Sequence, residues 1–313
     1  MINPKLKGTS DPGGIVWLAS YPKSGNTWLR IFLYHITRMA MGVPLDDNDL
    51  NRLDRSSVYE ARMFSLFSDL IGKPILDTTP PDIIAARPRV QAEVVKRAQR
   101  MVFVKTHMAL AKIMDTPMIN MDVTLGAIYV IRNPLDIVFS LSDHIGLSLD
   151  DAITVLCRPA FFSPTSTEEV YEPWGSWMEN VESWTGRPMG IIQVIRYEDM
   201  LANPLKVFSA VMNHLRQNPS DEEVAEAIEL SSFRRLSEIE KGSNFRERSQ
   251  NAERFFRVGR ANQWQDKLSE EQIGKLVAAN YRMMGRFGYL TPELNRFLPD
   301  GVDPQTLKPA LVH

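Results

Sequence analysis

The chain has 313 residues, of which 44% are hydrophobic and 24% are charged. This composition is typical of a globular protein with a sizeable core, and it excludes a disordered or fibrous chain. The formal net charge is -2, so no overall basic excess favours a nucleic-acid partner, although a local anion site is compatible with it.

The single cysteine, Cys157, cannot form a disulfide within the chain, which fits a reducing compartment. Met1–Gly14 is polar and lacks the apolar core of a signal peptide, and no apolar run is long enough to cross a bilayer. We therefore predict a cytoplasmic protein without a membrane span. We expect a flexible N-terminus over 1–14, one domain over 15–290 and a C-terminal tail over 291–313.

Short apolar segments alternate with segments of helical spacing along the chain. The expected strands are Ile15–Ser20, Met101–Lys105, Ala127–Ile131 and Ile191–Arg196. Helices are expected over Thr27–Met41, from Pro134, from about Pro204 after an acidic turn, and over Ser269–Phe287, where Ser269 is the cap. This alternation predicts a single α/β domain with a central, mainly parallel sheet flanked by helices.

Polar residues follow each of the predicted strands. Lys23 follows the first, Lys105 and His107 the second, Arg132 the third and Tyr197 the fourth. Ligands of parallel sheets bind beyond the carboxyl ends of the strands, so these residues are expected to share one site.

The segment Tyr21–Trp28 lies between the first strand and the first helix. A loop that enters a helix offers unpaired backbone N–H groups, Gly25 lets the backbone approach a ligand, and Lys23 adds a full charge. Short polar side chains complete the loop, namely Ser24, Asn26 and Thr27. The segment suits a phosphate or sulfate group, but it lacks the G-x-x-x-x-G-K-S/T pattern of a Walker A loop. The alternative is an ordinary turn with a solvated lysine.

Two further patterns carry charge or a titratable group. Arg132 at a strand end and Ser140 on the following helix can bind a second phosphate; the alternative is a salt bridge between Arg132 and Asp136. Lys105 and His107 are two apart in an extended segment and so face the same way. A histidine suits removal of a proton and a lysine suits stabilisation of negative charge, although a lone histidine is commonly structural or solvated.

The motifs resemble those of the cytosolic-type sulfotransferases, which use 3′-phosphoadenosine 5′-phosphosulfate (PAPS). Tyr21–Trp28 is similar to their phosphosulfate-binding loop, Y-P-K-S/A-G-T/N-T-W. Arg132–Ser140 matches their 3′-phosphate motif, R-N-P-x-D-x-x-x-S, and Val104–His107 resembles their catalytic strand. The resemblance runs in order from about Ile15 to Phe287 and implies a P-loop-like fold.

The resemblance implies a role for each residue of the loop. Lys23 is expected at the bridging oxygen and sulfuryl group, Ser24–Thr27 at the 5′-phosphate and Trp28 beside the adenine. Arg132 and Ser140 are assigned to the 3′-phosphate. Tyr197, in R-Y-E-D, and Phe233, in an S-F pair, are expected near the adenine, although either aromatic ring could equally be core.

A third motif, F-x-R-K-G-x-x-G-x-W, is matched in part by Phe255–Trp264. Arg257 and Gly259 match and are expected at the 3′-phosphate; the alternative is a basic surface loop. Val258 replaces the usual lysine and Asn262 the second glycine. A third departure is Ala109, which stands where the catalytic strand usually has a proline.

The implied reaction is direct in-line transfer of the sulfuryl group of PAPS to a hydroxyl of a small-molecule acceptor. His107 is the expected general base and Lys105 an assisting cation, and the product is adenosine 3′,5′-bisphosphate (PAP). No metal is expected, because no set of His, Cys, Asp and Glu has the spacing of metal ligands. The segment Gly146–Ile153 looks closer to bacterial small-molecule sulfotransferases. The dimer motif of animal enzymes, K-x-x-x-T-V, is not visible in Gln265–Leu276, so an oligomer is not expected by that route.

Two other functions stay open, a nucleotide-dependent kinase of P-loop-like fold and a non-catalytic protein that binds adenosine bisphosphate. The acceptor is also open among phenols, steroid-like alcohols, glycosides and glycopeptides. Val43–Arg100 and Gly146–Arg187 are expected to cap the sheet and form its pocket, with His144 as a candidate. Aromatic residues that could line this pocket or belong to the core are Phe64, Phe67, Phe161, Phe162, Trp174 and Trp177.

Overall fold

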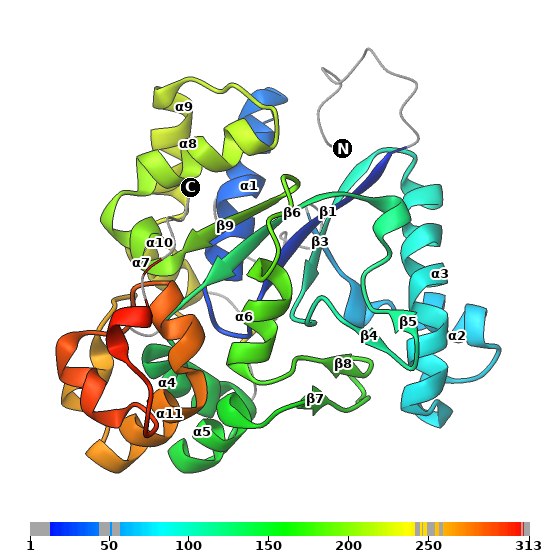
Figure 1. The fold of residues 1–313 in the computed structure, drawn as a ribbon. Coiled ribbons are helices and arrows are strands. Elements are labelled where there is room, and N and C mark those ends of the chain that lie inside the picture. The colour runs from blue at the N-terminus through cyan, green and yellow to red at the C-terminus, as the bar shows by residue number, and fades with distance from the viewer. Residues whose placement is uncertain are drawn as a thin grey trace.

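A computed structural model describes residues 13–43, 51, 57–241, 245, 247–248, 254–256, 259–307 and 309. A five-stranded sheet lies at the centre, with helices on both of its faces (Figure 1). Its strands are β1 (Gly14–Ser20), β2 (Ser57–Tyr59), β3 (Met101–Thr106), β6 (Thr124–Ile131) and β9 (Ile192–Arg196).

The strands are arranged in the order β2-β3-β1-β6-β9, and every neighbouring pair is parallel. In the register, Ile15 pairs with Val102 and Trp17 with Ala127. All five carboxyl ends therefore meet at one edge of the sheet. The predicted α/β fold with a parallel central sheet is confirmed.

Side chains of β1 alternate between two hydrophobic layers. Val16 and Leu18 pack in a cluster with α1 (Asn26–Ala40), α8 (Pro204–His214) and α9 (Asp221–Leu230). Trp17 and Ala19 belong to the larger cluster on the other face. The helices that contribute to this larger cluster are α2 (Phe64–Ile71), α3 (Pro80–Ala98), α4 (Pro134–Ile145), α5 (Leu149–Cys157), α6 (Trp177–Thr185) and α11 (Glu270–Arg286). Burial on both faces explains why the strands are apolar throughout.

Several smaller elements surround the sheet. Two short antiparallel pairs are β4 (Lys112–Ile113) with β5 (Thr116–Pro117), and β7 (Phe162–Ser163) with β8 (Glu172–Pro173). The remaining α-helices are α7 (Tyr197–Ala202) and α10 (Phe233–Lys241). The 3-10 helices are η3 (Glu60–Arg62), η4 (Ile75–Asp77), η5 (Met121–Val123), η6 (Gln263–Asp266), η7 (Pro292–Phe297) and η8 (Pro304–Thr306).

Two helix starts follow the predicted capping chemistry. Ser269 accepts a hydrogen bond from the backbone N–H of Gln272 and forms a capping box at the start of α11. Pro134 lies in the first turn of α4, where the side chain of Asn133 accepts from the backbone N–H of Leu135.

One local prediction was wrong, and one helix lies where none was predicted. The Pro-rich stretch before β3 contains a helix of 19 residues, α3, because Pro80 and Pro81 lie in its first turn, behind the Thr79 cap, where a missing N–H does no harm. The acidic turn expected after β9 is a short helix, α7. The sequence pattern also did not reveal β2, since an edge strand of three residues is too short to show a period.

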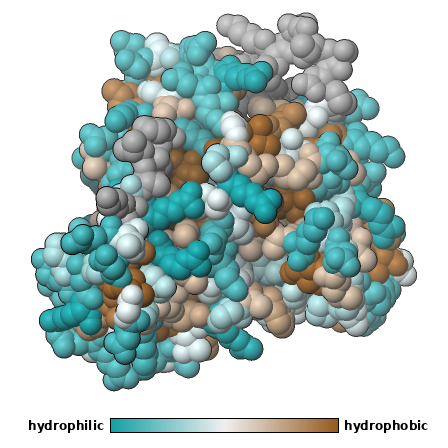
Figure 2. Space-filling model, viewed as in Figure 1, coloured by the Kyte–Doolittle hydropathy of each residue, from teal (hydrophilic) through white to brown (hydrophobic). Residues whose placement is uncertain are grey.

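Figure 2 shows the same face of the molecule coloured by hydropathy. Hydrophilic residues cover much of it, and hydrophobic residues gather in separate areas. Within the described part of the chain, the helices are too short or too polar for any of them to span a membrane.

Candidate functional site

A cavity of about 370 Å³ opens beyond the carboxyl ends of the strands. It brings together nearly all the described residues that the sequence motifs single out. Those on its wall are Lys23, Gly25, Asn26, Thr27, Trp28, Lys105, His107, Arg132, Ser140, Tyr197, Phe233 and Gly259. Ser24 is fully buried in the loop beneath them. Arg257 and Val258 lie outside the residues that the structure describes.

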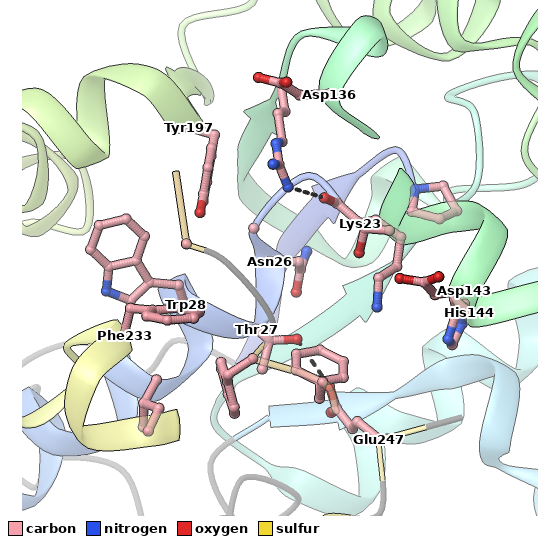
Figure 3. A pocket seen from close by; sticks show the side chains of 18 of the residues that line it. Lys23, Asn26, Thr27, Trp28, Asp136, Asp143, His144, Tyr197, Phe233 and Glu247 are labelled. Atoms are coloured by element: carbon pink, nitrogen blue, oxygen red, sulfur yellow. Dashed lines mark hydrogen bonds between the residues drawn. The ribbon is translucent and has the colours of Figure 1, made fainter. Parts of the chain in front are cut away.

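The cavity has two ends with different surroundings (Figure 3). Trp28, Tyr197 and Phe233 lie on one side, which we call the loop end. Asp143 and His144 lie on the opposite side, with Lys23 between. We call the region around His107 and these α4 residues the base end.

The loop after β1 takes a conformation that glycine permits. Gly25 has a φ of +107°, and a Cβ there would lie 2.6 Å from Cδ2 of Tyr197. Lys23 is also in the left-handed region, with a φ of +67°, which an L residue adopts only when its surroundings impose it. Together these turns carry the chain from β1 into α1 within five residues, so that Asn26 and Thr27 line the cavity.

Several buried polar atoms of this region lack a hydrogen-bond partner among the described residues. They are Oγ of Ser24, Oδ1 of Asn26, Nε1 of Trp28 and Nε of Arg132. Buried polar atoms are almost always bonded in folded proteins. Three of these four can donate, so the residues present fit a ligand that carries phosphate or other acceptor oxygens.

Arg132 does not pair with Asp136, so that alternative was wrong for these two described residues. The Arg132 guanidinium stacks 4.4 Å from the ring centroid of Tyr197 and donates to the carbonyl of Lys23 at 3.2 Å. Asp136 instead accepts from the backbone N–H groups of Asn262, at 2.6 Å, and Trp264, at 3.2 Å. The arginine thus faces the loop, and the aspartate holds the segment after Gly259.

That segment explains one departure from the family pattern. Asn262 has a φ of +62°, in the left-handed region where the family pattern has glycine. Asparagine is among the few other residues that adopt this conformation readily, so the turn is preserved. Gly259 also has a positive φ, and a Cβ there would lie 2.4 Å from the ring of Phe233.

Glu247 contacts the anion loop from a distant segment, and no sequence motif indicates it. Its carboxylate accepts a hydrogen bond from Oγ1 of Thr27 at 3.0 Å (Figure 3). It is also paired with Arg30. Burial opposes its ionisation, but Arg30 and Lys105 outweigh burial and hold the pKa of Glu247 well below its usual range. An internal carboxylate therefore occupies a place where an anionic ligand would bind.

Two lysines are desolvated beside the cavity. Nζ of Lys23 lies 4.2 Å from the ring centroid of Phe255, and Nζ of Lys105 lies 4.1 Å from that of Tyr59. Burial, and then the charge of Lys105, lowers the pKa of Lys23 to about 8. Burial also lowers the pKa of Lys105. In such a site a positive charge acts on a neighbouring anion more strongly than it would in water.

His107 is held in one tautomer. Its Nδ1 lies 2.8 Å from the carbonyl oxygen of Ser20, which can only accept, so Nδ1 carries the proton and the lone pair is on Nε2. Burial, and then the charge of Lys105, lowers the pKa of His107 well below its ordinary value. The imidazole is therefore neutral near pH 7 and able to accept a proton.

The backbone around His107 is fixed as well. Its N–H donates to Oε1 of Glu172 at 2.9 Å, and its carbonyl accepts from Nδ2 of Asn180 at 2.9 Å. Ala109 donates its N–H to the carbonyl of Pro173 at 2.9 Å. A proline, which the family pattern has at this position, could not make that bond.

The base end is built from segments in which the sequence showed little pattern. The rings of Tyr59 and Trp174 lie beside His107, with centroids 6.0 and 6.5 Å from the imidazole. Arg62 and Glu169 form an ion pair on the same wall. These residues were not predicted, apart from Trp174, since their segments carry no motif.

The other aromatic candidates do not line the cavity within the described part of the chain. Phe67 and Trp177 are buried in the core, and Nε1 of Trp177 donates to the carbonyl of Arg132 at 3.1 Å. Phe64 and Phe161 pack against the core from partly buried positions, and Phe162 is exposed.

His144 lines the cavity, on the helix that also carries Ser140. Burial, and then the charges of Lys23 and Lys105, lowers the pKa of His144 to about 3. It is therefore a second neutral imidazole in the site. Among the described residues, no group of three or more His, Cys, Asp or Glu could hold a metal ion.

The fold and the cavity define an α/β protein that binds an anionic, nucleotide-like ligand beside a neutral imidazole. Comparison with known families agrees with this class. The sulfotransferase domain family matches residues 14–288, and the chain belongs to this family. The predicted family and the enzyme class, a sulfotransferase, are confirmed.

Individual relatives are distant. Flavonol 3-sulfotransferase of Flaveria bidentis is 22% identical over 282 residues, covering 83% of this chain and 78% of the relative. Sulfotransferase 1A1 of Mus musculus is 24% identical over 231 residues, covering 71% and 67%.

Two solved structures share the fold. Mouse sulfotransferase SULT7A1 complexed with PAP has a TM-score of 0.56 at 17% identity, covering 95% of this chain and 88% of its own. Retinol dehydratase in complex with androsterone and PAP has a TM-score of 0.59 at 17% identity, covering 89% and 83%. At these identities the structures show the likeness of fold alone.

Proposed function

We propose that this protein transfers the sulfuryl group of PAPS to a hydroxyl of a small-molecule acceptor. The observation that carries the proposal is His107, a neutral imidazole with its lone pair on Nε2, beside two buried lysines and an anion loop. Two structural relatives were solved with PAP, and one of them with androsterone, an alcohol, which supports this pairing of ligands.

The loop end is the proposed PAPS site. Ser24–Thr27 would hold the 5′-phosphate, and Arg132, Ser140 and the Gly259 amide the 3′-phosphate. Trp28, Tyr197 and Phe233, which lie together in Figure 3, would enclose the adenine. Arg257 is assigned to the 3′-phosphate by its motif alone. The unpaired Nε of Arg132 and hydroxyl of Ser24 support this arrangement.

The transfer itself needs a base and local positive charge. Nε2 of His107 takes the proton of the acceptor hydroxyl while a bond forms between that oxygen and the sulfur. The bond between the sulfur and the phosphate oxygen breaks, and Lys23 and Lys105 stabilise the charge left on that oxygen. The products are a sulfate ester and PAP, and no covalent enzyme intermediate is required.

The base end is the proposed acceptor pocket. Its aromatic walls, Tyr59 and Trp174, suit an apolar or aromatic molecule that brings its hydroxyl to His107. We propose that residues 15–290 act as one domain, which the family match over 14–288 supports. A cytoplasmic location stays a prediction.

The test is transfer of label from PAPS to a panel of phenols, alcohols, glycosides and glycopeptides. We expect a labelled sulfate ester and PAP in equal amounts with at least one class. Labelled ATP is the matched control. Transfer from ATP would establish the kinase alternative, and tight binding of PAP without transfer to any acceptor would establish the non-catalytic one.

A further inference from the structure

The buried carboxylate of Glu172, in β8, joins the proposed base to two walls of the base end. Its Oε1 accepts from the backbone N–H of His107 at 2.9 Å. Its Oε2 accepts from the hydroxyl of Tyr59 at 2.9 Å and from Nε1 of Trp174 at 3.0 Å. Thr106 adds a longer bond of 3.5 Å. Glu172 is 1% exposed and is not among the described residues that line the cavity.

Stability alone does not explain a carboxylate at this position. Among the described residues, no lysine, arginine or histidine forms an ion pair with Glu172, so hydrogen bonds are its direct compensation for the loss of hydration. Well-packed hydrophobic residues commonly replace such buried charges without loss of stability. What the carboxylate adds is geometry, because its two oxygens connect its own segment, which carries Trp174, to the segments of His107 and Tyr59.

A second side chain repeats the connection. Nδ2 of Asn180 donates to the carbonyl of His107 at 2.9 Å and to the carbonyl of Trp174 at 2.7 Å. Both backbone polar groups of His107 are therefore bonded to side chains that also bond Trp174. Two side chains, Glu172 and Asn180, therefore fix the distance between His107 and Trp174.

We propose that Glu172 is a positioning residue for proton transfer, which keeps Nε2 of His107 in register with an acceptor hydroxyl held between Tyr59 and Trp174. This inference rests on the proposed function. Proton transfer in the transition state requires hydrogen-bond contact between base and hydroxyl, and a displacement of about 1 Å can lower the rate by roughly 100-fold. Glu172 acts through His107 and touches no reacting atom.

The test is Glu172→Gln, which keeps the size of the side chain. Glutamine has one acceptor oxygen, whereas the His107 N–H and the Trp174 indole N–H both can only donate. One of them must face the amide NH₂ group, and the base shifts relative to the wall. With unsubstituted phenol as acceptor, we expect kcat/KM to fall by roughly 10- to 100-fold.

The decisive readout is the dependence of this loss on acceptor acidity. 4-Nitrophenol gives up its proton readily and relies less on the base, so its kcat/KM should fall only a few-fold. The affinity for PAP, measured by calorimetry, should stay the same, because the loop end is untouched. A variant that merely contained less folded protein would lose both activities equally.

Glu60→Gln is the matched control. Glu60 is also 1% exposed, but its carboxylate bonds Gln91 and pairs with Arg87 instead of His107. An equal loss with both phenols in Glu172→Gln, or the same acidity-dependent loss in Glu60→Gln, overturns the inference. If the wild type accepts neither phenol, the comparison uses two hydroxyl compounds of different acidity from the acceptor panel. Wild-type protein that transfers to no acceptor overturns the proposed function instead.

Tyr59→Phe covers the case in which Glu172→Gln does not fold. It removes one hydrogen-bond partner of the carboxylate and keeps the ring beside His107 and Lys105. We expect a smaller loss with the same preference for the acidic phenol. Where both variants fold, their separate effects on the unfolding midpoint should not add up in the double variant. This non-additivity detects the hydrogen bond between Tyr59 and Glu172 without an activity measurement. Additive effects, or a loss independent of acidity, contradict the proposal.

Discussion

The two ends of the cavity are built in different ways. At the loop end, the anion site comes mainly from one continuous segment, Tyr21–Trp28, joined by Arg132 and Ser140 from one further motif. At the base end, His107 is the predicted base with Lys105 beside it, and the walls come from β2, η3, α4 and the segment before α6. The proposed anion loop is thus local in the chain, whereas the proposed acceptor pocket is assembled by tertiary packing. Substitutions at the two ends should therefore have separable effects.

The largest effect is expected for His107→Ala. Loss of a general base lowers turnover by roughly 100- to 10,000-fold, while PAP affinity should stay near that of the wild type. Turnover with PAPS and calorimetry with PAP measure the two ends separately. His214→Ala, in α8 and away from the cavity, is the control. Near-normal turnover with a poorly acidic alcohol would show that His107 is not the base.

Lys23→Ala should affect both ends. Removal of a charge aimed at the leaving oxygen lowers turnover by roughly 100-fold, and loss of a loop cation also weakens PAP binding. Steady-state kinetics with PAPS and calorimetry with PAP measure these losses. Lys275→Ala removes an exposed lysine paired with Glu271 and should change neither quantity. Unchanged rate and affinity in Lys23→Ala would refute the loop assignment.

The pH dependence of PAP binding should report Lys23 as well. Its pKa is lowered to about 8, so the protonated form that attracts phosphate is present at pH 7 and is lost as the pH rises through about 8. Because about a tenth remains protonated one pH unit above the pKa, affinity should fall about tenfold between pH 7 and 9. Calorimetry over this range measures the decline. In Lys23→Ala the curve should be flatter; an equally steep curve would assign the titration to another group.

The smallest effect, and the one of opposite sign, is expected for Glu247→Gln. The substitution removes a negative charge from beside Thr27 and leaves Arg30 and Lys105 less neutralised, so PAP should bind several-fold more tightly. Glu229→Gln, in an exposed pair with Arg234, is the control. Weaker binding in Glu247→Gln would mean that this carboxylate organises the loop and does not compete with the ligand.

The loop end could be predicted because its chemistry is local. Gly25 is required by a positive φ and a close ring, and the positions of Lys23 and Thr27 follow from the entry of one strand into one helix. Glu247 could not be predicted, because it lies 220 residues from Thr27 in the chain and belongs to no motif.

The base end shows the same limit more strongly. His107 was identified by its strand and its motif, but most of its neighbours, apart from Lys105 and Trp174, were not. The hydrogen bond from Tyr59 to Glu172 joins residues 113 apart, and the bond from His107 to Glu172 joins residues 65 apart. Neither pattern nor spacing encodes such contacts. Ala109 shows a milder case, since its departure from the family pattern is explained by a bond to Pro173 that appears only in the fold.

By itself, the sequence determined the parallel α/β fold, the family and the residues that follow each strand. Hydrophobic period and short motifs depend on neighbours along the chain, and parallel strands necessarily bring their carboxyl ends to one edge. Only the tertiary structure decided the tautomer of His107, the desolvation of Lys23, the place of Glu247 and the buried bonds of Glu172. These properties depend on burial and on partners from distant segments, which exist only once the chain is packed.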